Sequence, residues 1–492
     1  STLEMACLLP AAVLVGAFPP VPASHRLSAL AAMGTALAIA VLVFGGIIEG
    51  VDRYLEETKY EAYRVEATFD THYAHQTIVS RDSLVVLLTD NTVEASYPEP
   101  ETAENLLLPP LLYKPDAKEV LLIGRGELGV AQLAGTIPDL TLTTLDPRRK
   151  LSRHLDELIP CLPAGRGTAT DGSMERINDD PVAFFGRGHV GERYDVVIVN
   201  PGEFDSYRNS RLLTGRFLQA VRSSLTPGGI LCLPRSYDTD RYVTGDVQQV
   251  LGTIRNVLAE GFAHVAIWPG TMTLFLASDR ALFDISYDTL VSRIQRLPFE
   301  PQYIQDYYLY DRLDQLRRDR LHQAITHTGA RNNLRRPILA QYQALYRART
   351  DKFDRQVLSL VFGSRIWLVV LPFGLMAFCV IAAVGGSARR RFGLFLYLVA
   401  GLVSLALELL SFYVYQSSAG SLYAELAVLI GAFMLGLAFG TWYSVRMKGE
   451  RMEYPALLTL LTACVLFLLT FERVDPRAQL PYHLLFLFVV AA

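Results

Sequence analysis

Residues 119–129 read EVLLIGRGELG, and this stretch decides the fold. Its apolar first half predicts a buried strand, and Gly124, Gly126 and Gly129 follow at once. Glycines let the backbone turn tightly and approach a ligand, while the N-terminus of a following helix favours an anionic group. Asp146, near the end of the next predicted strand, supplies the context in which this spacing indicates nucleoside binding. The alternative is a strand-to-helix turn that holds no ligand.

Strands and helices alternate along the central part of the chain. We expect further strands at 140–145, 194–199, 229–233, 265–268 and 273–277, with helices at 128–135, 148–158, 213–225 and 247–259. This alternation predicts a parallel sheet with right-handed crossovers, the doubly wound α/β architecture. Ligands in such sheets bind at the carboxyl ends of the strands. Ahead of the sheet, the pattern predicts a strand pair within 78–89 and a short helix within 101–108.

The composition indicates a membrane protein. Hydrophobic residues make up 51% of the 492 residues and charged residues only 19%, against about 25% charged in soluble proteins. Apolar runs lie at both ends, at 5–18, 27–50, 366–384, 392–415, 422–443 and 455–471. The long runs have the ~20 residues that a spanning helix needs. The run at 5–18 is shorter, and because no basic segment precedes it we favour a spanning helix over a signal peptide.

The expected fold class is therefore a membrane protein with an α/β Rossmann-type domain flanked by transmembrane α-helices. We divide the chain into N-terminal transmembrane helices (1–50), a small β-rich or linker subdomain (51–115), the Rossmann domain (116–360) and a C-terminal helical module (361–492). The chain begins at Ser1 and stops within an apolar run, so we expect it to be part of a longer protein.

We expect a multi-pass protein of a cytoplasmic (inner) membrane of bacterial type. Basic links at 389–391 and 446–451 favour an extracytoplasmic central domain, whereas the basic stretch from Arg347 to Arg365 favours the opposite side. Partners would be the lipid bilayer and other membrane protein subunits. Glu408, inside an apolar run, indicates either a functional group such as a transporter uses or a protonated carboxyl in the bundle.

Two classes of partner are set aside. A net charge of −3 gives no basic face for nucleic acid. The five cysteines have no metal-type spacing, so we predict no metal site.

Several motifs resemble those of the spermidine synthases, the polyamine aminopropyltransferases. They are EVLLIGRGELG (119–129), LDP (145–147), RYDVVIVN (193–200), LTPGGI (225–230), WPG (268–270) and LFLAS (274–278). NNLRRPI (332–338) and the apolar motifs between Leu402 and Trp442 resemble the membrane-attached branch of that family, which carries a transporter-like module. The resemblance implies a methyltransferase-like Rossmann sheet preceded by a small β-element. It implies decarboxylated S-adenosylmethionine, or S-adenosylmethionine itself, as the donor of the transferred group.

The resemblance assigns donor binding to Gln76, Gly124, Gly126, Gly129, Asp146 and Asp180. The acid that holds the ribose in the family falls at Thr144 here, and Asp146 is the nearest substitute on the same strand face. Glu104 remains from the family's Tyr-His-Glu element, whose histidine is absent.

The catalytic aspartate of the family falls at Asn200, which cannot take a proton at neutral pH. Glu203, three residues on, could serve as the base instead. Arg208 and Arg211 indicate either an anionic ligand or a solvated loop edge, and the solvated edge is favoured slightly. The sequence therefore leaves three readings open. The first is a non-catalytic domain used for ligand sensing or as a structural subunit of a membrane assembly, and the second is an aminopropyltransferase. The third and least favoured is transport, which Glu408 and the transporter-like helix pair indicate.

Overall fold

The computed structural model describes most of the central part of the chain and selected segments of the C-terminal part. The described residues are 54–71, 74–124, 126–158, 174–187, 194–204, 206–240, 243–334, 336–350, 352–363, 370, 374, 378, 401, 404–412, 414–415, 425–446, 462–463, 465–467, 470 and 479–491. The chain divides into two compact units. Unit 1 comprises 1–75 and 365–492, and unit 2 comprises 76–364, so the division passes through one strand, β2.

A four-stranded sheet precedes the larger one. Its order is β1-β2-β3-β4, formed by Arg64–Asp70, His75–Arg81, Leu84–Thr89 and Thr92–Tyr97. β3 pairs antiparallel with both β2 and β4. At the turn between β3 and β4, Asp90 and Asn91 both have positive φ, of 48° and 64°. Such a turn matches the right-handed twist of a hairpin, and these residue types tolerate the conformation. The strand pair expected within 78–89 is confirmed.

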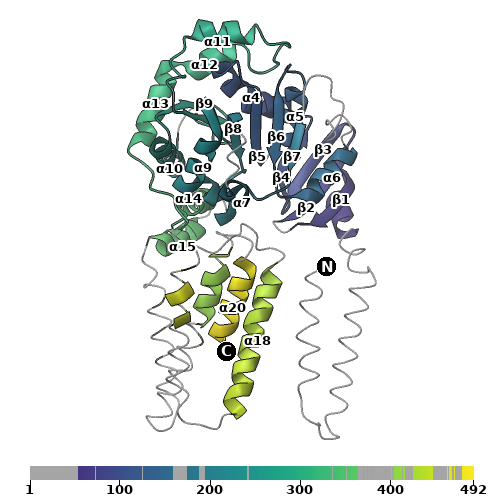
Figure 1. Ribbon diagram of the computed structural model, residues 1–492, viewed down its shortest axis with the longest axis vertical. Helices are drawn as coiled ribbons and strands as arrows, with labels where there is room; N and C mark the ends of the chain where they lie inside the picture. Colours follow the sequence, from purple (N-terminus) through teal and green to yellow (C-terminus); the bar gives the residue numbers. More distant parts are fainter. Residues whose placement is uncertain are drawn as a thin grey trace. The chain divides into compact units, whose positions relative to one another are not determined.

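The large sheet of unit 2 has seven strands in the order β10-β11-β9-β8-β5-β6-β7. The strands are β5 (Glu119–Gly124), β6 (Thr141–Leu145), β7 (Met174–Ile177), β8 (Tyr194–Asn200), β9 (Leu225–Arg235), β10 (His264–Trp268) and β11 (Thr273–Ser278). β5 to β9 pair in parallel. This small sheet followed by a Rossmann-like α/β sheet is the architecture that the resemblance implies (Figure 1).

The expectation of a wholly parallel sheet is wrong at one edge. β11 runs antiparallel to β9 and to β10. Only residues 269–272 join β10 to β11, and so short a link makes a hairpin, because a parallel pair needs a crossover of a dozen or more residues.

Helices cover the large sheet of unit 2 (Figure 1): α9 packs against β9, α10 packs against β10, and α14 packs against α10. Their bounds are α4 (Pro100–Tyr113), α5 (Glu127–Ala134), α6 (Arg149–Leu158), α7 (Pro181–Gly186), α8 (Tyr207–Ser210), α9 (Gly215–Ser224), α10 (Gly245–Gly261), α11 (Tyr287–Ile294), α12 (Asp306–Leu313), α13 (Gln315–Thr326), α14 (Ile338–Arg347) and α15 (Lys352–Phe362). The helices expected at 128–135, 148–158, 213–225 and 247–259 are confirmed within a few residues.

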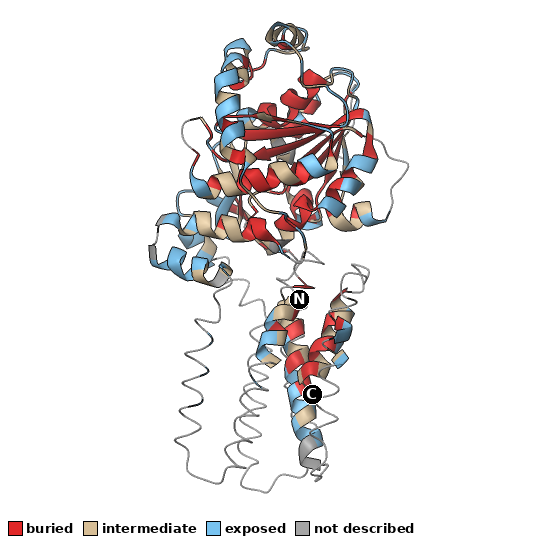
Figure 2. Cartoon of the chain, turned by 90° about the vertical axis from the view of Figure 1, so that its left-hand side faces the viewer, coloured by how far each residue is buried: buried red, intermediate tan, exposed pale blue. Residues whose placement is uncertain are grey.

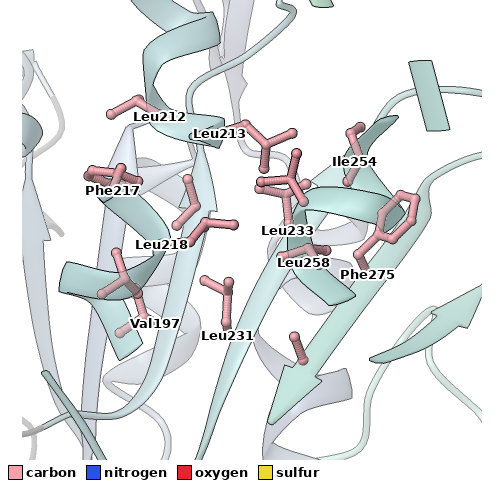
Figure 3. Close-up of a cluster of buried hydrophobic side chains, with 14 of the residues drawn as sticks. Val197, Leu212, Leu213, Phe217, Leu218, Leu231, Leu233, Ile254, Leu258 and Phe275 are labelled. Atoms are coloured by element: carbon pink, nitrogen blue, oxygen red, sulfur yellow. The ribbon is translucent and has the colours of Figure 1, made fainter. Parts of the chain in front are cut away.

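The core of unit 2 lies where strands meet helices. Val197 and Leu231 of β8 and β9, Leu218 of α9 and Leu258 of α10 are almost wholly buried and lie together in Figure 3. Figure 2 shows the strands in the buried interior and the outer faces of the helices exposed. Burial of each such side chain stabilises the fold by about 1.5–3 kcal/mol. This rigid core holds the carboxyl ends of the strands, where the candidate site lies.

The described part of unit 1 includes two apolar helices, α18 (Leu426–Arg446) and α20 (Gln479–Ala491), which share a cluster around Leu429, Phe467 and Leu487. Within the described residues, Leu426–Tyr443 of α18 is long and apolar enough to cross a membrane. One helix of this kind does not show that a chain spans a membrane. The other expected spans, at 5–18, 27–50, 366–384, 392–415 and 455–471, lie wholly or partly outside the described residues.

Candidate functional site

The glycine loop lies between the ends of β5 and β8. Gly124 has φ +92°, and a Cβ atom there would lie 2.5 Å from the backbone oxygen of Asn200. Gly126 has φ +101° and is the N-cap of α5. A Cβ atom on Gly129 would lie 3.0 Å from Cβ of Ala103 in α4. The fold alone therefore accounts for glycine at these three positions. The backbone turn requires positive φ at Gly124 and Gly126, and β8 and α4 approach too closely for a larger side chain at Gly124 and Gly129.

Replacing Gly124 by alanine should destabilise unit 2 by roughly 3 kcal/mol, because the residue would be strained at positive φ and would collide with backbone. Gly186, at the end of α7, is the matched control, since a Cβ atom there meets nothing within 4 Å. Gly186→Ala should stay within about 1 kcal/mol of the unsubstituted protein. Urea unfolding of the full chain, followed by pulse proteolysis, measures both. Equal effects of the two substitutions would contradict this account of the loop.

Asp146, the residue expected to hold a ribose, is bound by the chain itself. Its Oδ1 accepts hydrogen bonds from the backbone N–H and Nε of Arg148, at 2.8 and 2.9 Å. Its Oδ2 accepts from Nη2 and Nε of Arg148, at 2.6 and 3.1 Å. The turn Asp-Pro-Arg favours the first of these bonds, since aspartate side chains readily accept from the backbone two residues on. Both carboxylate oxygens of Asp146 are therefore engaged.

Glu94 of β4 completes this arrangement. Nη1 of Arg148 lies 2.7 Å from a carboxylate oxygen of Glu94. The side chains of Arg148, Glu94 and Asp146 are only 9%, 3% and 10% exposed. Burial alone would lower the pKa of Arg148, but the two carboxylates raise it above its ordinary value, so the guanidinium stays charged. We call these three residues the Arg148 clamp.

The clamp continues into the small sheet. Thr89 Oγ1 hydrogen-bonds to Glu94, and it lies 3.1 Å from Oε1 of Gln76, the residue opposite it in β2. Gln76 is fully buried, and its Nε2 has no hydrogen-bond partner among the described residues. The structure thus links Gln76 to Asp146 in one network through Thr89, Glu94 and Arg148. Donor binding by these two residues stays a prediction.

Asp180 also has a structural partner at each oxygen. Its Oδ1 accepts from the backbone N–H of Val182 and Ala183, at 3.0 and 3.1 Å, and so caps α7. Its Oδ2 forms an ion pair with Arg211. Arg211 is only 4% exposed, so the expectation of a solvated loop edge is wrong for this residue.

Arg208 lies beside the clamp. Burial lowers its pKa, and so does the charge of the neighbouring Arg148. A guanidinium stays charged even so. Three arginines and three carboxylates lie in this region, so their formal charges sum to zero. The region therefore gives no electrostatic preference for an added anion. The residues are Arg148, Arg208, Arg211, Glu94, Asp146 and Asp180.

Asn200 and Glu203 lie at the carboxyl end of β8. Nε2 of Gln343, in α14, donates to Oε2 of Glu203 at 3.2 Å, and the hydroxyl of Tyr237 donates to Oε1 of Gln343. Burial raises the pKa of Tyr237, and the Glu203 carboxylate raises it further. Tyr237 is therefore a neutral hydroxyl at physiological pH and can only donate or accept a hydrogen bond.

A buried cation lies close to this group. Arg235, at the end of β9, is 2% exposed and lies over the ring of Phe204, with 4.4 Å between Cζ and the ring centroid. It donates to the backbone oxygen of Gly202. An amine substrate is cationic in water, so a fixed guanidinium beside the strand end disfavours it.

Two further residues singled out in the sequence have structural roles. Glu104 is 4% exposed and accepts from the backbone N–H of Gln302, Tyr303 and Ile304, at 2.7, 2.8 and 2.9 Å. Thr144 is buried within β6. Both side chains are thus part of the buried interior of unit 2.

Sequence reasoning missed Arg148, Glu94, Arg235, Tyr237 and Gln343. The Asp-Pro-Arg turn was a local signal for Arg148, and Arg235 and Tyr237 follow a strand that the pattern does predict. Glu94 and Gln343 gave no signal, because they come to the site from distant elements. Asn332, in NNLRRPI just before α14, connects the start of that helix to the segment after β8. Its Nδ2 donates to the backbone oxygens of Ser210 and Leu213 at 2.9 and 2.7 Å.

No protein family model matches this chain, and no curated protein matches it either. Among solved structures, a spermidine synthase in complex with the transition-state analogue AdoDATO matches with a TM-score of 0.41 and 15% identity. The match covers 53% of this chain and 88% of the synthase chain. Spermidine synthase from Thermotoga maritima has a TM-score of 0.39 and 15% identity over 53% of this chain and 88% of its own. Human methyltransferase-like protein 13 in complex with SAH has a TM-score of 0.29 and 17% identity over 39% of this chain and 86% of its own. Likeness at this level concerns the fold alone.

Proposed function

We propose that unit 2 is a non-catalytic, spermidine-synthase-like domain that serves as a structural subunit of a membrane assembly. The Arg148 clamp carries this proposal. A donor nucleoside would need the Asp146 carboxylate for its ribose hydroxyls, and the four hydrogen bonds from Arg148 already use that carboxylate. An arginine bonded to both oxygens of a buried carboxylate is among the stronger pairings in proteins, so a neutral diol does not displace it readily.

The remaining donor residues point the same way. Asp180 is used as a helix cap and as the partner of Arg211. In this conformation, the side chains therefore do not fit decarboxylated S-adenosylmethionine or S-adenosylmethionine.

The acceptor side supports the proposal independently. Aminopropyl transfer consumes a neutral amine, so the site must stabilise the loss of a proton from an ammonium group. The resemblance puts the base at Asn200, whose amide takes no proton at neutral pH, and the buried charge of Arg235 repels a cationic acceptor.

A transfer assay tests this function. The purified full chain, given decarboxylated S-adenosylmethionine with putrescine or spermidine, should form no aminopropylated product above the level without protein. The same holds for methyl transfer from S-adenosylmethionine. Product formation by the full chain that Glu203→Gln abolishes would overturn the proposal.

One observation favours the second candidate, an aminopropyltransferase. Glu203 accepts a hydrogen bond from Gln343 and lies close to Tyr237 at the carboxyl end of β8, the strand end to which the resemblance assigns the base. Under this alternative, Glu203→Gln would lower the rate at least 100-fold, a typical loss for a general base, whereas Glu175→Gln, on the strand β7, would leave it unchanged.

A further inference from the structure

Tyrosine side chains gather on the outer side of two neighbouring helices of unit 2, α11 and α12 (Figure 1). Tyr307 and Tyr310 are 64% and 71% exposed, and their spacing of i, i+3 puts them on one side of α12. The ring of Tyr310 packs edge-on against Tyr287 of α11, with 5.9 Å between the ring centroids. The opposite side of α12 carries Leu309 and Arg312, which are buried. We call Tyr287, Tyr307 and Tyr310 the tyrosine patch.

Large exposed apolar side chains are concentrated at this place. Among the described residues between 76 and 364, seven such side chains are exposed, and four of them lie within 303–316. Single exposed apolar residues are normal on a protein surface, whereas a group of them marks an interaction site. Tyrosine in particular is enriched where proteins bind one another. The four side chains are Tyr303, Tyr307, Tyr310 and Leu316.

Two carboxylates lie beside the tyrosine patch. The hydroxyl of Tyr287 donates to the backbone oxygen of Asp306 at 3.0 Å, and Asp288 follows Tyr287 in α11. Asp288 and Asp306 are exposed, and neither forms an ion pair with a cation in the described part of the chain. Both carboxylates are therefore open to a cation from outside.

The surrounding surface has an excess of negative charge. Between residues 284 and 311, five exposed residues are acidic and only Arg296 is both basic and exposed. Of the five, Asp311 is paired with Arg317. Like charges repel, so this surface disfavours an anionic partner such as nucleic acid or an acidic lipid surface and favours a basic one. The acidic residues are Asp284, Asp288, Glu300, Asp306 and Asp311.

The helix α12 itself shows which cation suits such tyrosines. On the side of α12 that faces the domain, the guanidinium of Arg312 lies over the ring of Tyr308, with 4.6 Å between Cζ and the ring centroid. A guanidinium is attracted to the face of an aromatic ring and can also pair with both oxygens of a carboxylate. The compact ammonium of lysine does neither as well. The tyrosine patch and its two carboxylates therefore suit arginine better than lysine.

We propose that the tyrosine patch is a docking surface for a basic, arginine-containing segment of a partner protein. Guanidinium groups of that segment stack on the rings of Tyr307 and Tyr310 and pair with the carboxylates of Asp288 and Asp306. The inference rests on the role as an assembly subunit in the proposed function, for which it names the surface and the chemistry of a partner. Product formation in the transfer assay would overturn the lack of catalysis but would leave the binding result below unchanged.

Fluorescence anisotropy of a fluorescein-labelled nona-arginine peptide, titrated with the purified full chain, tests the proposal. The double variant Tyr307→Ala/Tyr310→Ala should weaken binding by about 5- to 30-fold, because each exposed cation–π contact contributes a factor of about 2 to 5. The double variant Asp288→Asn/Asp306→Asn should weaken binding at least about 2-fold. A nona-lysine peptide should bind the unsubstituted chain more weakly than nona-arginine does, and a nona-glutamate peptide should not bind.

Two further double variants are the matched controls. Tyr54→Ala/Leu55→Ala removes side chains that are 68% and 56% exposed in unit 1. Asp82→Asn/Asp139→Asn removes two exposed charges from turns, where asparagine tolerates the positive φ of both residues. Both controls should bind nona-arginine as the unsubstituted chain does. The midpoint of urea unfolding should stay the same in all four variants, since the substituted side chains lie at the surface.

Three results would overturn the proposal. The first is equal binding of nona-arginine by the unsubstituted chain and by Tyr307→Ala/Tyr310→Ala. The second is no binding of nona-arginine by the unsubstituted chain at concentrations up to about 1 mM. The third is an oligomer of the full chain, seen in sedimentation velocity, that Tyr307→Ala/Tyr310→Ala dissociates, because a second copy of the chain would then cover the tyrosine patch.

Discussion

Replacing Arg148 by methionine should lower the free energy of unfolding of unit 2 by about 3–5 kcal/mol. Methionine keeps much of the side-chain volume but leaves the carboxylates of Asp146 and Glu94 buried without their cation. A buried charge that has lost its partner is one of the few causes of so large a loss. Urea unfolding of the full chain, read by pulse proteolysis, measures the change.

The control is an ion pair of similar length at the surface. Arg222 lies 2.7 Å from Asp279, with side chains 50% and 40% exposed. Arg222→Met should cost no more than about 1 kcal/mol, because water solvates the remaining carboxylate. The triple variant with Arg148→Met, Asp146→Asn and Glu94→Gln should recover most of the loss, since no uncompensated charge remains. A small effect of Arg148→Met, or no recovery in the triple variant, would show that the clamp does not stabilise the domain.

Glu104→Ala should be the second large effect, with a loss of roughly 4 kcal/mol. The substitution removes a buried carboxylate that accepts three backbone hydrogen bonds, and each donor left without a partner costs about 1–3 kcal/mol. Glu104→Gln should cost about half as much, because an amide oxygen can still accept some of these bonds but carries no charge. The same unfolding measurement applies.

Glu101, one turn earlier in α4, is the matched control for Glu104. It lies in the first turn of the helix and is exposed. Glu101→Ala should cost less than about 1 kcal/mol, the contribution of a carboxylate to the helix dipole. If Glu104→Ala were no worse than Glu101→Ala, the role of Glu104 as an anchor for the loop at 302–304 would be wrong.

Much of the fold could be predicted because it depends on local patterns. The apolar runs of β5, β8 and β9 and the periodic helices between them show the α/β class, and the glycine loop marks the first crossover. β1, β4 and β7 escaped prediction because their residues are only partly buried, so no apolar run marks them. The antiparallel edge of β10 and β11 depended on the length of a four-residue link.

The candidate site was harder to predict because it depends on pairings between distant residues. The resemblance predicted that Asp146 and Gln76 bind the donor, and this stays a prediction; the structure links the two side chains through Thr89, Glu94 and Arg148. The sequence could not show that Arg148 would be held by Glu94, which lies 54 residues away. Arg211 was misjudged for a similar reason, since its burial follows from its pairing with Asp180, 31 residues earlier.

Calorimetric titration of the full chain with decarboxylated S-adenosylmethionine and with S-adenosylmethionine tests the central claim most directly. The closed Arg148 clamp predicts no saturable heat up to ligand concentrations of about 1 mM, where a binding free energy of about −4 kcal/mol would still be visible. A spermidine synthase titrated under the same conditions serves as the positive control. Saturable one-to-one binding that Asp146→Asn weakens would contradict the claim that this chain's own arginine occupies the donor site.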